Sequence, residues 1–566
     1  MTRSDDGILV VLVAAAAVMA SGYVLDVAGL SIHPWLLGVV AAGALLFGMW
    51  TLPRGTARVS SATSSAPWLA LLLVVPYALW MAAPDRLPVT NGPDVVHHLQ
   101  LIHLIAATGR LPHDAAQYPF LLEMMNYTPG SHIVAAVAAH WLRVDPVRVL
   151  LPLTALFVAV KVGIVYVLAV RLLPEKRGAP VYALAAPVLL MVPAPYVIGS
   201  FFHFFYYAQV LSETFAMAMV VAALGWTRTG ASRYLWLASA CAVGVFLSWP
   251  MWLVPAGTSV LAAIAARALA RPACPPQSWR KLEGRAHWWI EAAIVMAPVA
   301  LLGILHASTH AAGASIIGSS GAVTRPSAET LGAIFVALGF AGTILAVRVA
   351  PARPVAVLFA VTILQALALA AFDARAGARS FYMPFKMVYL IVLPCAVLGA
   401  LALATAVDFV ASKLPPIRLA RLDGARSGEA MASAIPLLIA ALLATGRMPV
   451  KRQQSPLSES ALAAGLWTRD ALPVACVDYF SRHWLTGYWL HLDVLGNPRL
   501  SDRMRAETFE FPDTVGKWIQ GKGLPYGIVE DVDAIPRDAR VDMITVREFG
   551  RSAVVKNTRA APCRDK

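Results

Sequence analysis

Long runs of apolar residues recur along the first 446 positions and are separated by short polar segments. Runs of this kind are typical of helices that span a membrane, because about 20 apolar residues cross the hydrocarbon core. The pattern therefore predicts a polytopic α-helical membrane protein with thirteen spans, at residues 8–28, 34–52, 67–83, 147–171, 179–199, 209–227, 233–249, 252–270, 288–305, 329–348, 354–372, 384–408 and 430–446.

The longest polar interruption of this pattern runs from Asp85 to His132 and is dense in ionisable and turn-forming residues. Its aromatic and apolar content argues against disorder, so we expect a structured external loop at 85–146. Residues 132–142 are apolar but too short to cross a core of roughly 30 Å. We expect them to form a helix that lies along the outer membrane surface.

The chain changes character after residue 446. Segments with alternating apolar and polar residues predict strands, and residues 513–521 are typical of a short amphipathic helix. We therefore expect two parts, a transmembrane domain at 1–446 and a small soluble α/β domain at 447–566. The only cysteines of this second part are Cys476 and Cys563, and we predict that they form a disulfide bond.

Composition excludes a soluble protein, since 58% of the residues are hydrophobic, only 14% are charged and the mean hydropathy is +0.66. The formal net charge of +14 does not indicate nucleic-acid binding, because the basic residues lie mostly in short loops between apolar runs. By the positive-inside rule those loops are cytoplasmic. This predicts a multi-pass plasma (inner) membrane protein with a cytoplasmic N-terminus, and with the 85–146 loop and the C-terminal domain outside.

Asp94 opens a helical pattern in the polar stretch. One interpretation is that its carboxylate only caps that helix. The other adds His97 and His98, one turn further on, because Asp94 and His98 share a helix face. That group is expected to act as a catalytic base with orienting partners. Alternatively Asp94 and His98 are the candidates to hold a divalent cation, the one cofactor that we consider.

Two further groups are candidates for binding. The first lies in the segment 201–213. Its aromatic residues are typical of a membrane interface, but we expect His203, Tyr207, Gln209 and Glu213 to contact substrate. The second consists of cations on the predicted outer side, Arg375, Arg379 and Lys386. They either contact lipid phosphates in general or form a specific site for an anionic lipid head, which suits the geometry of arginine and lysine.

Three short motifs carry a resemblance to a known family. They are Asn91 to Asp94 (NGPD), Gly109 to Pro112 (GRLP) and Tyr127 to His132 (YTPGSH), followed by many spans and a soluble C-terminal domain. In this order and spacing the chain resembles the C superfamily of membrane glycosyltransferases (GT-C fold). It is most similar to the enzymes that depend on polyprenyl-phosphate sugars, of the protein mannosyltransferase and arabinofuranosyltransferase kinds.

The resemblance implies roles for individual residues. Asp94 would be the base for the acceptor hydroxyl, Arg379 and Lys386 would hold the lipid phosphate, and Tyr127 and His132 would bind substrate. Many members of the family carry a second acidic residue beside the first. Here Val95 and Val96 follow Asp94, which departs from the pattern of a metal site.

These observations predict an inverting glycosyltransferase. Its donor would be a polyprenyl-phosphate-linked sugar, taken from the membrane lipids, and its acceptor a glycan, lipid or protein of the cell envelope. No GxGxxG or Walker motif indicates a nucleotide site. Two other classes stay open: a transporter or flippase of a lipid-linked substrate, and a non-catalytic scaffold with the same fold.

Overall fold

The computed structural model describes residues 3–51, 61–90, 92–114, 116–118, 121–173, 179–270, 287–309, 321–377, 381–413, 424–449, 451–481, 483–497 and 511–562. Every apolar run that the sequence marks as a span contains helix. These helices are α1 (Arg3–Val27), α2 (Pro34–Thr51), α3 (Ser61–Met81), α6 (Pro146–Leu172), α7 (Ala179–Leu189), α8 (Ala194–Val197), α9 (Gly199–Phe202), α10 (Tyr207–Thr229), α11 (Arg233–Ser248), α12 (Leu253–Ala270), α13 (His287–Thr309), α15 (Ala333–Ala346), α16 (Arg353–Arg375), α17 (Tyr382–Lys413) and α18 (Gly424–Ala444).

Seven helices of the described ranges are long and apolar enough to cross a membrane. The number is eight if α7 and the α8–α9 segment, which meet at an angle of 78°, form one broken span. The five other expected spans contain shorter apolar helices. The chain is therefore a multi-pass helical protein, and the count of thirteen spans stays a prediction.

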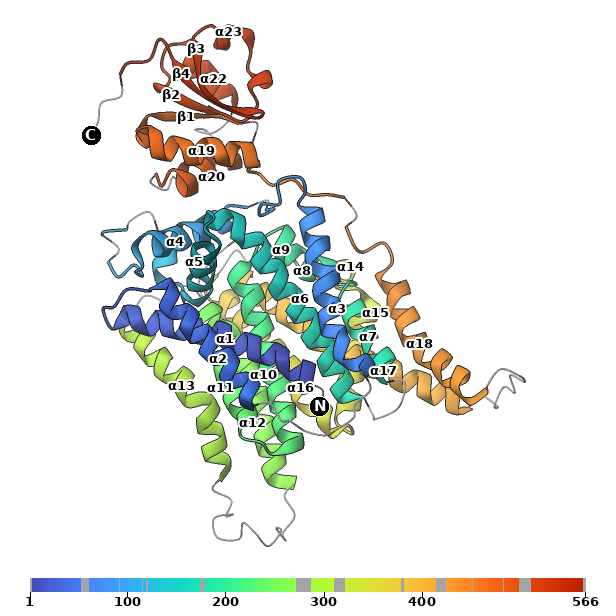
Figure 1. Ribbon diagram of the computed structural model, residues 1–566. Coiled ribbons are helices and arrows are strands. Elements are labelled where there is room, and N and C mark those ends of the chain that lie inside the picture. The colour runs from blue at the N-terminus through green and yellow to red at the C-terminus, as the bar shows by residue number, and fades with distance from the viewer. Residues whose placement is uncertain are drawn as a thin grey trace.

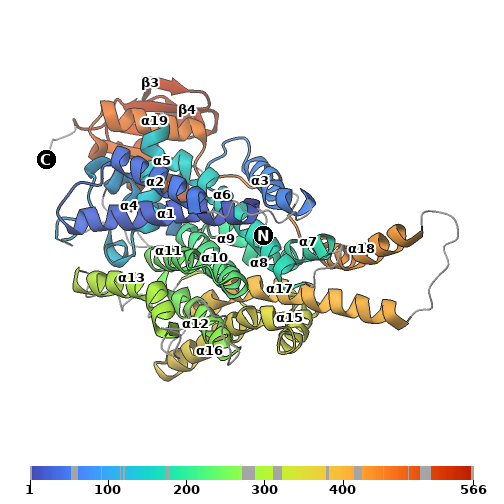
Figure 2. The same ribbon diagram turned by 60° about the horizontal axis from the view of Figure 1, so that its bottom comes forward.

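The most deeply buried helices are α6, α10 and α17, and the other helices pack around them. Figure 2 shows α15 and α16 beside α17. The contact between α15 and α17 requires glycine, because a Cβ on Gly342 would lie 2.0 Å from the carbonyl oxygen of Leu398. Small residues of this kind let helices approach closely where no hydrophobic effect drives them together.

The polar stretch folds at one end of the helical bundle. It forms α4 (Asp94–Thr108), a 3-10 turn (Leu122–Asn126) and α5 (Gly130–Leu142). The short apolar helix that the sequence predicts is thus present, and it packs against α4 and α1 with most of its face buried. The loop that follows α4 is tied to α1, because buried Asp26 accepts hydrogen bonds from the Leu111 amide (2.9 Å) and from His113 Nε2 (2.6 Å).

The C-terminal part forms a mixed four-stranded sheet in the order β1 (Val477–Phe480), β2 (Tyr526–Val529), β4 (Ser552–Asn557) and β3 (Met543–Phe549). The β1–β2 pair is parallel and the other two pairs are antiparallel. Helices α19 (Glu459–Ala471), α20 (Trp484–Trp489), α22 (Phe511–Ile519) and α23 (Arg537–Arg540) accompany the sheet. The expected amphipathic helix is α22, whose Trp518 packs on Phe480.

Figure 1 shows the α4–α5 segment between this sheet and the helical bundle. The division of the chain into domains at residue 446 stays a prediction. Cys476 is disulfide-bonded, but Cys563 lies outside the described residues, so the pairing of these two cysteines also stays a prediction.

Candidate active site

Three chain segments converge where α4, α10 and α17 begin. Asp94 is the first residue of α4, Tyr206 directly precedes α10, and Lys386 lies one turn into α17. The carboxylate of Asp94 interacts electrostatically with Lys386, Tyr206, Tyr382 and Tyr127. The residues that the sequence proposes as base and as phosphate ligand are therefore neighbours, although 292 positions separate them (386 − 94).

The interpretation of Asp94 as a helix cap is wrong. Pro93 occupies the N-cap position of α4, and no side chain caps this helix. Asp94 is only half-buried, and its carboxylate has no hydrogen bond or ion pair to any residue that the structure describes. It is therefore free to accept a proton or a hydrogen bond from a bound molecule, and its charge is favourably placed at a helix N-terminus.

Lys386 is buried, with 4% of its surface exposed. Its Nζ donates to Gln209 Oε1 at 3.1 Å and lies 2.8 Å from the ring centroid of Tyr206. The rings of Tyr382 and Trp249 complete the surroundings, with centroids 5.1 Å and 5.9 Å from Nζ. A cation between aromatic faces is stabilised by their quadrupoles, and no carboxylate of the described chain bonds to it directly. This amine is therefore available to an anionic ligand.

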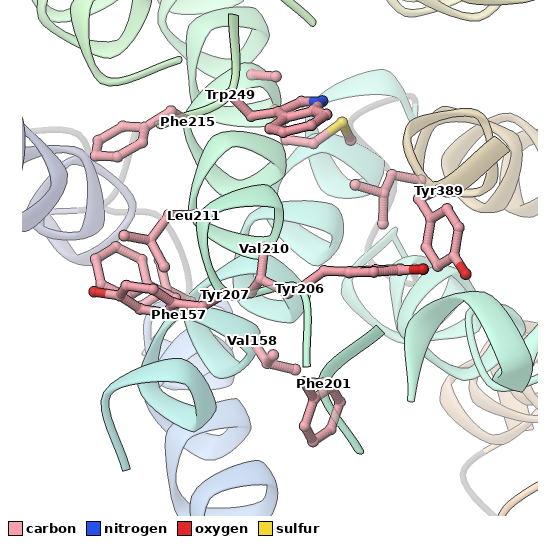
Figure 3. Packing of buried hydrophobic residues seen from close by; sticks show 14 of the residues in the cluster. Phe157, Val158, Phe201, Tyr206, Tyr207, Val210, Leu211, Phe215, Trp249 and Tyr389 are labelled. Carbon is pink, nitrogen blue, oxygen red and sulfur yellow. The ribbon is translucent and has the colours of Figure 1, made fainter. Parts of the chain in front are cut away.

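A strained turn positions the two tyrosines at the start of α10. The preceding residue, Phe205, is fully buried and has a φ of 55°, which is unusual for a bulky side chain. Figure 3 shows Tyr206 and Tyr207 leaving this turn in opposite directions. Tyr206 points towards Tyr389, whereas the Tyr207 hydroxyl donates to the Ser131 carbonyl at 2.9 Å. Tyr207, a predicted substrate contact, therefore supports the start of α5.

His98 and His132 form a stacked, hydrogen-bonded pair, as Nδ1 of His98 lies 2.8 Å from Nε2 of His132. Burial, followed by the nearby His97 and Lys386, lowers the pKa of His98 to about 3. Burial also holds the pKa of His132 well below its ordinary value. Both rings are therefore neutral at pH 7, and one donates to the other. The ring of Tyr127 lies edge-on to His98, with centroids 5.2 Å apart.

His97 points to different partners from those of His98. Its Nδ1 lies 3.3 Å from Glu123 Oε1, and its Nε2 lies 3.0 Å from the hydroxyl of Tyr488 on α20. His97 thus links α4 to the C-terminal part of the chain. The described residues contain no group of three side chains of the His, Cys, Asp or Glu type that could hold a metal ion. His98, which the sequence proposes as a metal ligand beside Asp94, is hydrogen-bonded to His132. A bound cation stays an untested expectation.

Gln209 and Glu213, which the sequence proposes as substrate contacts, belong to a buried chain of hydrogen bonds. Gln209 donates to Glu213 Oε1 at 3.3 Å, and Lys161 of α6 donates to Glu213 Oε2. Both carboxylate oxygens are therefore occupied by protein side chains. Sequence reasoning missed Lys161, although a signal existed. Lys161 and Glu213 are opposite charges inside apolar runs, where unpaired charges are costly.

Two expected binding residues lie elsewhere. His203 is exposed, and its ring packs edge-to-face against the ring of Phe204. It lines a cavity of about 240 Å³ whose other walls include Met81 and Arg447. Arg375 is exposed at the end of α16 and has no hydrogen bond or ion pair within the described part of the chain. Arg379 lies outside the described residues.

A second, partly buried cluster attaches the C-terminal part to α4. His103 lies between Asp493, at 3.3 Å, and Asp145, at 3.2 Å. Burial alone would lower the pKa of His103, but these two carboxylates raise it to about 9. Burial raises the pKa of Asp493 to about 7, against the opposing effect of His103. The imidazole is therefore protonated at neutral pH and joins α4, the start of α6 and a π-helical turn (Leu490–Val494).

No protein-family model matches the chain, and no curated protein matches it. Among solved structures, the chain is similar to ArnT from Cupriavidus metallidurans bound to undecaprenyl phosphate, with 14% identity, coverage of 89% of this chain and 100% of that chain, and a TM-score of 0.44. It is also similar to an oligosaccharyltransferase from Archaeoglobus fulgidus tethered with an acceptor peptide, with 13% identity, 82% and 69% coverage, and a TM-score of 0.44.

A third similar structure is the arabinofuranosyltransferase AftD from Mycobacteria, with 17% identity, coverage of 89% of this chain and 40% of that chain, and a TM-score of 0.46.

Proposed function

We propose that this protein is a membrane glycosyltransferase that moves a sugar from a polyprenyl phosphate to a hydroxyl group of an acceptor, with inversion, on the outer face of the plasma membrane. One observation supports it above all others. An unpartnered carboxylate, Asp94, interacts electrostatically with a buried amine, Lys386, that bonds to no carboxylate of the described chain. A base and a phosphate ligand are the two groups that this reaction needs.

In the proposed step, the Lys386 amine donates to an oxygen of the lipid phosphate. The bond between the sugar carbon and the phosphate oxygen breaks, and the polyprenyl phosphate leaves with the electron pair. The acceptor oxygen forms the new bond to the same carbon from the opposite side, and its proton passes to Asp94. Stabilising the leaving phosphate by a fixed donor in a dry site is an effective way to lower such a barrier.

The neutral His98–His132 pair lies beside the Tyr127 ring. In the proposed step this pair orients the acceptor hydroxyl towards Asp94, because a neutral imidazole can donate or accept a hydrogen bond without adding charge. The proposed step assigns no role to a metal ion, and a bound cation stays an untested expectation.

The test uses purified protein in lipid bilayers, with undecaprenyl phosphate and its sugar derivatives as probes. Lys386→Met, which keeps length but removes the charge, should weaken binding of the lipid phosphate roughly 10–100-fold, the value of a hydrogen bond to a charged group. Lys413→Met is the matched control, because Lys413 is exposed at the far end of the same helix. Equal binding by both variants, or no sugar transfer from any polyprenyl-phosphate donor, would overturn the proposal.

One observation favours transport as a second candidate. The Lys161–Glu213 pair is buried inside two apolar helices, and ionisable residues at such depth often mark transport pathways. Sealed vesicles separate the two functions. Movement of a lipid-linked sugar between leaflets without any transfer product would favour a flippase, whereas product formation on one face would favour the transferase.

A further inference from the structure

The buried pair of α6 and α10 is connected to the candidate active site. Lys161 and Glu213 are each only 1% exposed, and Lys161 donates to Glu213. Glu213 lies six residues into α10, about 9 Å from the start of that helix. Both side chains are buried in the helical bundle, where charged groups in an apolar surrounding are costly and often functional.

Gln209 connects the Lys161–Glu213 pair to Lys386 through two hydrogen bonds. Its Nε2 donates to Glu213 Oε1 at 3.3 Å, and its Oε1 accepts from Lys386 Nζ at 3.1 Å. An ionised carboxylate can only accept and an ammonium group can only donate. The amide of Gln209 therefore cannot turn over without losing both hydrogen bonds, and its carbonyl oxygen is fixed towards the lysine.

This arrangement determines how Lys386 presents its protons. The ammonium group carries three N–H donors. One is held by Gln209, and the face of the Tyr206 ring lies 2.8 Å from the nitrogen. A donor remains for a ligand on the side of Asp94, the one carboxylate of the described ranges, apart from Glu213, that interacts with Lys386 electrostatically.

We propose that Glu213, held in place by Lys161, is a positioning residue that acts through Gln209 to aim the Lys386 amine at the lipid phosphate. The inference rests on the proposed function, because the phosphate is the ligand that the amine would meet. It also reassigns Glu213 from substrate contact to support. A buried side chain with both oxygens occupied cannot bind substrate directly.

The hydrogen bonds through Gln209 predict a specific rearrangement in Glu213→Gln. The Lys161 ammonium group takes the only acceptor of the new amide, its oxygen, and leaves the NH2 group facing Gln209. Gln209 must then turn its own oxygen towards position 213, which presents its NH2 group to Lys386. The NH2 group of Gln209 and the Lys386 ammonium group are both donors, so the lysine side chain moves away from Gln209. Adding Lys161→Met frees the oxygen of the new amide for Gln209 and restores the original orientation.

The experiment measures the dissociation constant of the polyprenyl phosphate probe and the melting temperature for each variant in lipid. Glu213→Gln should weaken binding roughly 10–100-fold, and the double variant with Lys161→Met should regain most of that loss. Gln209→Met removes the relay and leaves the Lys161–Glu213 ion pair intact, and it should weaken binding as Glu213→Gln does. If Glu213→Gln does not fold, Gln209→Met tests the positioning role in its place.

Arg171→Met is the matched control. Arg171 is a buried cation on the same helix as Lys161, and it donates to the Val221 carbonyl of α10 at 2.6 Å, away from Lys386. This variant should lower the melting temperature and leave lipid-phosphate binding unchanged. Parental binding by Glu213→Gln and Gln209→Met, or equal losses in the control, would overturn the positioning role. Should the parent bind no polyprenyl phosphate, the proposed function falls, and this inference falls with it.

Discussion

Replacing Asp94 by asparagine separates catalysis from structure at the proposed base. Asparagine has the same shape, and Asp94 makes no hydrogen bond to the described residues that it could lose. Because Pro93 and not Asp94 is the N-cap, the folded protein gives up only the attraction between the carboxylate and the helix dipole, about 0.3–1 kcal/mol, and some attraction to Lys386. The stability of Asp94→Asn should therefore remain close to that of the parent.

The effect on turnover should be much larger. A positioned general base contributes about 10²–10⁴-fold, which at 1.36 kcal/mol per factor of ten is about 3–5 kcal/mol of the barrier. Binding of the lipid phosphate should stay equal or become tighter, because the variant removes an anion near the site of another anion. Loss of turnover without loss of binding distinguishes a base from a binding residue.

The assay is single-turnover sugar transfer in bilayers, with lipid-phosphate binding and thermal unfolding measured on the same preparation. Asp114→Asn is the control, since Asp114 is an exposed acid in the same loop. Asp94→Glu should retain partial activity, because its carboxylate reaches about one bond further. Near-parental transfer by Asp94→Asn would refute the assignment, and so would a loss of binding as large as the loss of turnover.

The remaining predictions concern the contacts that hold the site in place. A double-mutant cycle between His97→Phe and Tyr488→Phe should give a coupling energy of about 1 kcal/mol for their hydrogen bond, and a value near zero would mean that the C-terminal part is not docked through it. The pKa of His103 is raised in the folded protein, so its stabilising effect is complete below about 6.5 and is lost as pH rises through about 9. The hydrogen-exchange protection factors around Asp493, which are corrected for the intrinsic effect of pH on exchange, should therefore fall in that range in the parent and not in His103→Gln. Gly342→Val should unfold at a clearly lower temperature than the parent, because its side chain meets backbone at 2.0 Å, and unchanged melting would contradict the packing of α15 on α17.

Several features followed from the sequence because they depend on local pattern alone. An apolar run long enough to span satisfies its own backbone hydrogen bonds only as a helix, which is why the helix positions were predicted well. The same reasoning identified the short helix α5 and the amphipathic α22. Asp94 and Lys386, both ionisable residues at the boundary between polar loop and apolar run, were chosen from the sequence as base and phosphate ligand, and the structure brings them into electrostatic interaction. The proposed role of each is still a prediction.

What only the tertiary structure decided is which side chains meet across the fold. His97 and His98 are adjacent in sequence, yet one bonds to Tyr488, 391 positions away, and the other to His132, 34 positions away. Lys386 meets Gln209 across 177 positions. Such contacts depend on how each helix is rotated about its axis. A helix that is apolar on all sides carries no hydrophobic stripe to fix that rotation, so close packing and the pairing of the few buried charges determine it.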